Sequence, residues 1–206
     1  MTYRAFLDAN VLVQSRVRDV LLTLADLGTF DPLWSERVLQ EVSRNLPVTM
    51  AGGGKEALFR AMEAAFPEAM VSWPGVVDIE VRSSINLSDQ HVVAAALWAG
   101  ADALVTEDAR LADECSDLVD VQLPGVFAAY AIDIDPMAAA AALVDMARRR
   151  WLDDESVASS EHVLDRLVAW MGRHGWAVAA PLIDAEPVRS GIDIALDEHL
   201  ERARDG

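Results

Sequence analysis

The sequence has few of the features that would indicate a disulfide scaffold or a membrane anchor. It contains one cysteine, Cys115, which excludes an internal disulfide framework and fits the reducing conditions of the cytoplasm. No uninterrupted apolar stretch reaches the length of a bilayer span, and the N-terminal residues MTYRAFLD lack the basic, apolar and small-residue sections of a signal peptide. We therefore expect a cytoplasmic protein without a membrane partner.

Basic residues are also scarce. The chain has 17 Lys and Arg against 34 Asp and Glu, which gives a net charge of −17. Proteins that hold nucleic acid through surface charge are usually basic, so this balance argues against a passive DNA or RNA coat. It does not exclude an enzyme whose acids bind a divalent metal, because the metal supplies the missing positive charge. A basic protein partner would also suit such a surface.

The first two thirds of the chain alternate between short apolar runs and helical patterns. Strands are predicted at residues 4–7, 69–73, 103–106 and 118–125. Helices are predicted at residues 17–28, 35–47, 55–67 and 87–100, with Ser35 and Ser88 as N-caps. Such alternation predicts an α/β fold in which a central parallel sheet is covered by helices on both faces, a three-layer α/β/α arrangement.

The remaining residues contain only helical patterns. Asp135 as N-cap and Pro136 at the first helical position open a helix over 137–151, and further helices are predicted at 159–175 and 191–206. We therefore expect a strand-bearing domain at 1–135 and a helical C-terminal extension at 136–206. The acid excess is larger in the first part: residues 1–136 hold 9 basic and 21 acidic residues, and residues 137–206 hold 8 and 13.

Four acids from separate segments are placed where they could meet. Asp8 and Asp108 each end a predicted strand, and sites in open parallel sheets form at the carboxyl ends of the strands. Asp89 lies in the first turn of a helix, where the helix dipole favours a carboxylate, and Glu41 borders the apolar stripe of another helix. Each acid alone has a structural explanation, as a loop acid, a helix-start acid or a solvated surface residue. Together they predict a site for Mg²⁺ or Mn²⁺, since hard cations take oxygen ligands.

The segments FLDANVLV, RVLQEV and LSDQHVVAAALWAGADALVTEDARL, in this order, resemble the PIN-domain ribonucleases, particularly the toxins of VapBC-type toxin–antitoxin pairs. The resemblance covers roughly residues 3–130 and implies a PIN-like fold and a metal-dependent nuclease. It implies Asp8, Glu41, Asp89 and Asp108 as catalytic and metal-binding acids, with Asn10 and Thr106 as supporting polar residues. It also implies a cognate antitoxin protein as partner, and a homodimer or a toxin–antitoxin hetero-oligomer.

One position departs from the family pattern. Many members read T-x-D-x-D-F where this chain has T-E-D-A-R-L, so that Arg110 takes the place of the second acid. The fourth ligand could be Asp108 with help from Glu107 or Asp113, and the number of metal ions is left open.

The predicted reaction is hydrolysis of RNA phosphodiester bonds by metal-activated water. This chemistry needs no His or Cys nucleophile, and His91 is expected to be a surface or packing residue. Arg16, Arg18 and Arg110 could steer RNA phosphates, although a solvated helix face explains them equally well. The basic run 148–151 could also contact RNA, but the end of a helix is the simpler interpretation.

Two other functions remain open at the level of the sequence. The LDANVLV segment also resembles the start of haloacid-dehalogenase phosphatases, with Asp8 as nucleophile, but Asn10 stands where their second acid belongs. The other alternative is a catalytically idle PIN-like fold that serves as a binding module.

Overall fold

The computed structural model describes residues 2–47, 53–72, 89–115, 117–152 and 159–205. Contacts between Cα atoms divide the chain into two compact units. Unit 1 contains residues 1–18 and 30–123, and unit 2 contains residues 19–29 and 124–206. The first unit carries every strand of the described residues, and the elements of the second are all helical.

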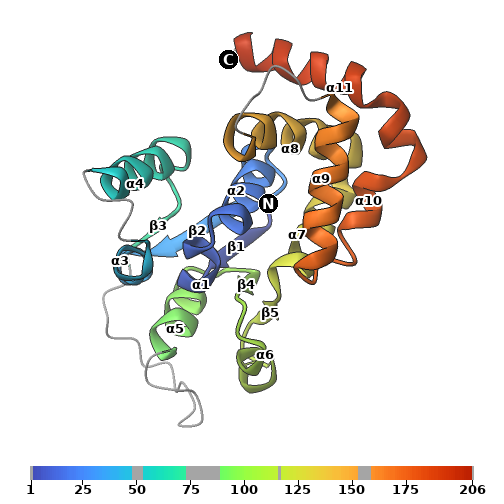
Figure 1. Ribbon diagram of the computed structural model, residues 1–206. Helices are drawn as coiled ribbons and strands as arrows, with labels where there is room; N and C mark the ends of the chain where they lie inside the picture. Colours follow the sequence, from blue (N-terminus) through green and yellow to red (C-terminus); the bar gives the residue numbers. More distant parts are fainter. Residues whose placement is uncertain (1, 48–52, 73–88, 116, 153–158, 206) are drawn as a thin grey trace. The chain divides into compact units, whose positions relative to one another are not determined.

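Unit 1 is built on a five-stranded parallel sheet with the order β3-β2-β1-β4-β5 (Figure 1). The strands are β1 (Arg4–Leu7), β2 (Asp31–Ser35), β3 (Met70–Val71), β4 (Ala103–Val105) and β5 (Asp120–Gln122). In register, Ala5 of β1 pairs with Pro32 on one side and with Ala103 on the other. The central strands are almost entirely buried, as expected for parallel strands covered by helices. The predicted α/β class and parallel sheet are therefore confirmed.

The helices of unit 1 lie between its strands along the chain. They are α1 (Ala9–Val13), α3 (Glu36–Asn45), α4 (Gly54–Ala65), α5 (Gln90–Trp98) and α6 (Ala109–Cys115), together with the first turn of α2 (Ser15–Asp26). Helix α3 packs against α1 and β2, α5 packs against β2 and β4, and α6 packs against β5. The predicted N-cap at Ser35 is confirmed, since its hydroxyl accepts a hydrogen bond from Val38 N. The predicted cap at Ser88 lies outside the described residues.

Strand β2 was not predicted, because its sequence DPLWS contains a proline and begins with aspartate, both typical of turns. The sheet tolerates the proline for a geometric reason. Asp31 N donates to Tyr3 O toward β1, so the nitrogen of Pro32 points to the opposite side. In the described residues β3 pairs only with Trp34 and Ser35, so no strand lies beside Pro32 where its N–H would be needed.

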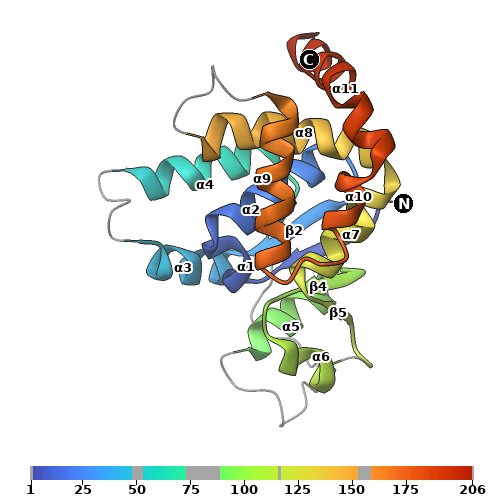
Figure 2. The same cartoon turned by 45° about the vertical axis from the view of Figure 1, so that its right-hand side comes forward.

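Unit 2 contains residues 19–29, which include most of α2, and five further helices (Figure 2). These are α7 (Pro124–Ile134), α8 (Pro136–Trp151), α9 (Ser160–Arg173), α10 (Ala180–Asp184) and α11 (Glu186–Asp205). Helix α8 packs against the other four, and its residues 139–147 are all buried. The predicted start of α8 is confirmed: Pro136 occupies its first turn and Asp135 Oδ1 accepts from Ala138 N.

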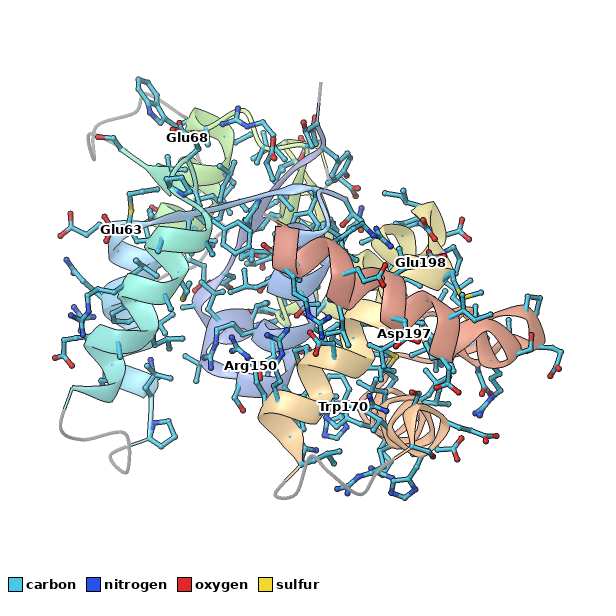
Figure 3. All side chains as sticks on the ribbon, turned by 90° about the horizontal axis from the view of Figure 1, so that it is seen from above. Glu63, Glu68, Arg150, Trp170, Asp197 and Glu198 are labelled. Carbon is cyan, nitrogen blue, oxygen red and sulfur yellow. The ribbon has the colours of Figure 1, made fainter. Side chains whose placement is uncertain are left out.

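Residue Asp19 joins two distant segments of unit 2. Its carboxylate accepts hydrogen bonds from Arg150 Nη1 at 3.0 Å and from Trp151 Nε1 at 3.1 Å. Trp151 stacks edge-on against Trp170, which in turn contacts His174 and Trp176 (Figure 3 marks Arg150 and Trp170). The basic run at the end of α8 is thus engaged in packing, which agrees with the simpler interpretation of residues 148–151.

The division by contacts differs from the boundary predicted after residue 135. The boundary between the units falls between residues 123 and 124, so α7 belongs with the helical extension. Residues 19–29 also belong to the unit that contains this extension.

No single helix among the described residues is long and apolar enough to cross a membrane. Helices α7 and α8 meet the length and composition criteria only as a pair, and they are bent by 119°.

Candidate functional site

The candidate site lies where the order of the sheet reverses. The chain passes from β1 outward to β2 and β3 and then returns to place β4 on the other side of β1. In open α/β sheets, this switch point between neighbouring strands is the usual position of a binding site, at the carboxyl ends. Asp8 follows β1 directly and residues 106–108 follow β4. The hydrogen bond from Asp8 N to Val105 O holds the two strand ends together.

The side chain of Asp8 is almost fully enclosed, with 8% of its surface exposed. Its Oδ1 accepts from Ala9 N at 2.6 Å, so that Asp8 is also the N-cap of α1. Its Oδ2 accepts from Asn10 Nδ2 at 2.8 Å and from Thr106 Oγ1 at 2.7 Å. Burial raises the pKa of the Asp8 carboxyl; the hydrogen bonds of Thr106 and Ala9 act in the opposite direction, and the negative charges of Glu41 and Asp89 raise it further.

Asn10 and Thr106 form a polar bridge beside Asp8. Asn10 Nδ2 also donates to Thr106 Oγ1 at 2.9 Å, and Asn10 Oδ1 accepts from Glu107 N at 3.1 Å. The Thr106 hydroxyl additionally accepts from Asp108 N at 3.1 Å, and the residue is fully buried. These contacts fix the direction of the Asp8 carboxylate and the path of the chain after β4.

Glu41 projects from α3 toward a buried histidine of α5. His91 Nε2 lies 2.8 Å from Glu41 Oε1, and Arg37 Nε lies 3.9 Å from the same oxygen. His91 is 2% exposed, and its Nδ1 has no hydrogen-bond partner in the described part of the chain. Burial lowers the pKa of His91, although the charge of Glu41 acts to raise it. The sequence predicted a surface or packing residue, and the burial of the ring agrees with packing; the ring also contacts Glu41, a candidate site acid.

Asp89 immediately precedes α5 and makes no side-chain cap to that helix. Its negative charge acts to raise the pKa of three groups, Asp8, His91 and Arg110. The charge of Asp89 therefore acts on residues that follow both β1 and β4.

Asp108 is paired with Arg110. Asp108 Oδ1 accepts from the backbone N of Arg110 at 3.0 Å and from its Nε at 3.1 Å, and Oδ2 accepts from Nη2 at 2.7 Å. The hydrogen bonds from the Arg110 guanidinium lower the pKa of the Asp108 carboxyl. This pairing was not foreseen from the sequence, although the replacement of an acid by Arg110 in T-E-D-A-R-L was the signal that could have shown it.

The other predicted residues lie around this edge or away from it. Glu107 is exposed and accepts from Gln14 Nε2 at 3.4 Å, and Asp113 is exposed on α6. Arg16 is exposed on α2. Arg18 is 6% exposed and its Nη1 donates to Leu12 O at 2.6 Å, so its guanidinium faces the protein interior and is poorly placed to meet an RNA phosphate.

The carboxylate oxygens of the candidate acids are the type of ligand that Mg²⁺ and Mn²⁺ prefer. The charges of Glu41 and Asp89 act on Asp8, and a buried carboxylate beside two further acids favours a positive ligand. In the described residues, however, no group of three or more His, Cys, Asp or Glu side chains could hold a metal ion. The acids have other partners: the Asp8 oxygens accept three internal hydrogen bonds, Glu41 contacts His91, and Asp108 pairs with Arg110.

Comparison with known proteins does not identify a family for this chain. The sequence matches no protein-family model and no curated protein, and the fold matches no solved structure.

Proposed function

We propose that this chain is a metal-dependent endoribonuclease with a PIN-like three-layer α/β/α fold, and that it is the toxin of a toxin–antitoxin pair. One observation carries the proposal. A buried aspartate at the switch point of a parallel sheet is fixed by Asn10 and Thr106 and lies within the electrostatic reach of two other acids. A carboxylate kept there against its desolvation cost is best explained by a cationic ligand.

The residues that would hold Mg²⁺ or Mn²⁺ are Asp8 and Asp89, with Glu41 acting on the ion or on its water. When bound, such an ion lowers the pKa of a coordinated water and offsets negative charge on a phosphodiester. Thr106 and Asn10 would keep Asp8 pointed at the ion, and His91 would orient Glu41. Outer partners of this kind fix ligand direction in metal sites.

An RNA substrate and an antitoxin partner follow from the resemblance and are compatible with the charge of the chain. A surface with a net charge of −17 repels RNA unless cations intervene, and it attracts a basic protein segment. A neighbouring gene for a small DNA-binding protein with a basic arm would support the toxin assignment. Association of the two purified proteins, measured by light scattering, tests it directly.

The substitution Asp8→Asn tests the catalytic proposal. We expect Mg²⁺-dependent cleavage of single-stranded RNA to fall by more than about 100-fold, because losing even an outer partner of a metal ligand costs about 10–100-fold. The matched control is Asp31→Asn, which changes an exposed acid at the start of β2, away from the carboxyl ends of the strands. Circular dichroism of both variants establishes that the fold is kept.

Each other outcome has a defined meaning. Equal cleavage by the wild type and Asp8→Asn would remove Asp8 from the mechanism. Absence of both Mn²⁺ binding and RNA cleavage in the wild type would favour a binding module. A phosphoaspartate trapped on Asp8 by a phosphate analogue would favour the phosphatase alternative.

A further inference from the structure

Helix α7 exposes apolar side chains where a surface helix normally exposes polar ones. Val126, Tyr130 and Ile134 are 37%, 65% and 66% exposed, and they follow one another at intervals of four residues. Side chains at this spacing lie on one side of a helix. The side of a helix that faces away from the core is usually polar. In α7, however, Asp133 is the only exposed polar residue.

Two further exposed apolar side chains of unit 2 lie close to the ends of α7. Near its start, the indole of Trp176 lies against Gly125, and Val178 follows two residues later at 60% exposure. Beyond its end, the terminal methyl of Met137 lies against α11 one turn before Ile194, which is 68% exposed. The five exposed large apolar side chains in the described part of unit 2 thus lie on α7 or near its ends. Together they form the α7 face.

The apolar pattern of α7 is symmetric about Tyr130. Val126 and Ile134 lie four residues before and after it, which is about 6 Å along the helix axis in each direction. An antiparallel second copy of α7, related by a two-fold axis at Tyr130, would place Tyr130 on Tyr130 and Val126 on Ile134. This is an isologous contact, in which one surface is complementary to itself.

The charges of the helix favour the same arrangement. Residues 124–132 carry no charge, and the exposed acids Asp133 and Asp135 both lie at the C-terminal end of α7. In an antiparallel pair these acids approach the N-terminal end of the other helix, where the helix dipole is positive. A parallel pair would place acid beside acid. The uncharged middle of the face offers no acid that would select a basic partner.

We infer that the α7 face is the interface of a homodimer, with two copies of this chain related by a two-fold axis at Tyr130. Its five side chains expose roughly 400 Å² of apolar surface, which is within the range of about 300–600 Å² for the largest patch on a typical monomer. A standard interface buries roughly 800 Å² on each partner, so this dimer belongs to the weak class. We expect a dissociation constant on the order of 10 µM.

Sedimentation equilibrium of the full chain from about 1 to 300 µM tests the inference, with Tyr130→Lys and Tyr130→Glu as variants. Each variant places like charges on the two-fold axis and removes a central aromatic contact. We expect each to raise the dissociation constant by more than about 30-fold. An equimolar mixture of the two variants should restore the dimer, because opposite charges then meet on the axis. Circular dichroism establishes that both variants keep the fold.

The matched control is Trp98→Lys. Trp98 is also a large apolar side chain on a helix, 53% exposed, but it lies on α5 of unit 1. We expect the dissociation constant of this variant to equal that of the wild type.

The salt dependence separates a second copy from a basic partner. Two chains that each carry a net charge of −17 repel one another, and raising the salt from about 0.1 to 1 M shortens the range of that repulsion from about 10 to 3 Å. Apolar contacts are not screened by salt. The homodimer should therefore become tighter at high salt, whereas a complex with a basic segment should become weaker.

Four results would overturn the inference. These are a wild type that stays monomeric at about 300 µM in both salts, a dimer that persists in both Tyr130 variants, a dimer in each salt that is lost on mixing the two variants, and a dimer that weakens at high salt. If a monomeric wild type binds a basic amphipathic peptide and Tyr130→Lys does not, the face belongs to another protein. The inference is independent of the proposed nuclease function, because none of these measurements involves RNA or metal.

Discussion

At the scale of single residues, the hydroxyl of Thr106 links the two strand ends of the site. It donates to Asp8 Oδ2 and accepts from Asn10 Nδ2 and Asp108 N. Thr106→Val keeps the shape of the side chain and removes all three hydrogen bonds. Under the proposed function, in which Asp8 holds the ion, we expect Mn²⁺ affinity to fall by about 10–100-fold, the cost of losing an outer partner of a metal ligand.

Thr106→Ser is the matched control, because it keeps the hydroxyl and removes only the methyl group. Calorimetry with Mn²⁺ should therefore separate the serine variant from the valine variant. Equal affinities in the two variants would mean that the hydroxyl does not orient Asp8.

The buried His91 predicts a particular dependence of stability on pH. Its pKa in the folded protein lies below the ordinary value of 6.5, because burial disfavours the charged ring. Above pH 6.5 both folded and unfolded chains hold it neutral. As the pH falls through 6.5, the unfolded chain takes up a proton that the folded chain does not, so the free energy of unfolding decreases.

His91→Leu removes this titration while it keeps an apolar side chain of similar size. Urea unfolding of the metal-free proteins between pH 5 and pH 8 should show a steeper loss of stability toward acid for the wild type than for the variant. An equal loss of stability toward acid in the wild type and in His91→Leu would contradict a lowered pKa of His91.

At the scale of secondary-structure elements, Gly125 and Gly191 both lie in helices where an added Cβ would come very close to a neighbouring side chain. The two neighbours differ in how easily they can move. A Cβ at Gly125 of α7 would lie 2.7 Å from two indole atoms of Trp176 and 3.0 Å from its Cα, and a rigid ring and backbone cannot move away. A Cβ at Gly191 of α11 would lie 2.8 Å from the terminal methyl of Met137, which is the end of a flexible side chain.

We therefore expect opposite results from alanine at the two positions. Gly125→Ala should lower the free energy of unfolding by about 1–3 kcal/mol through overpacking. Gly191→Ala should be neutral or stabilising, because alanine gains about 1 kcal/mol over glycine inside a helix. Urea unfolding of both variants measures this difference, and an equal loss in both would show that Trp176 does not restrict α7.

The sequence predicted elements well where periodicity and caps agree. Ser35 and Asp135 mark real helix starts, and the apolar run before Asp8 is the central strand β1. Helix α1 was missed because its five residues are too short to show a helical period, and β2 was missed because Pro32 is tolerated only through a sheet geometry that sequence cannot reveal. Among site residues, Asp8, Asn10 and Thr106 meet as expected, whereas the pairing of Asp108 with Arg110 depends on a side-chain geometry that spacing alone leaves open.

At the scale of the whole molecule, the acid excess predicts how the proposed binding of RNA responds to salt: the affinity should depend on salt only weakly. Basic nucleic-acid binders that make 6–10 phosphate contacts lose about 10³–10⁵ in affinity between roughly 50 and 200 mM salt. For a chain with a net charge of −17, salt screens repulsion as well as attraction.

We therefore expect the affinity of Asp8→Asn for a short RNA, measured by fluorescence anisotropy, to change by less than about 10-fold over the same range. Asp8→Asn is used because the proposed mechanism predicts that this variant does not cleave the RNA during the measurement. A loss as steep as that of basic binders would indicate a concentrated basic contact surface despite the overall charge.

The contact of Asp19 with Arg150 also has a consequence for synthesis on the ribosome. The two residues are 131 positions apart, and the segment 19–29 belongs to a unit whose other members all come after residue 123. At translation rates of about 5–20 residues per second, this segment waits on the order of 10 s for its partners to emerge. During that interval Asp19 lacks its partners Arg150 and Trp151, so this part of unit 2 can be completed only after residue 151 has left the ribosome.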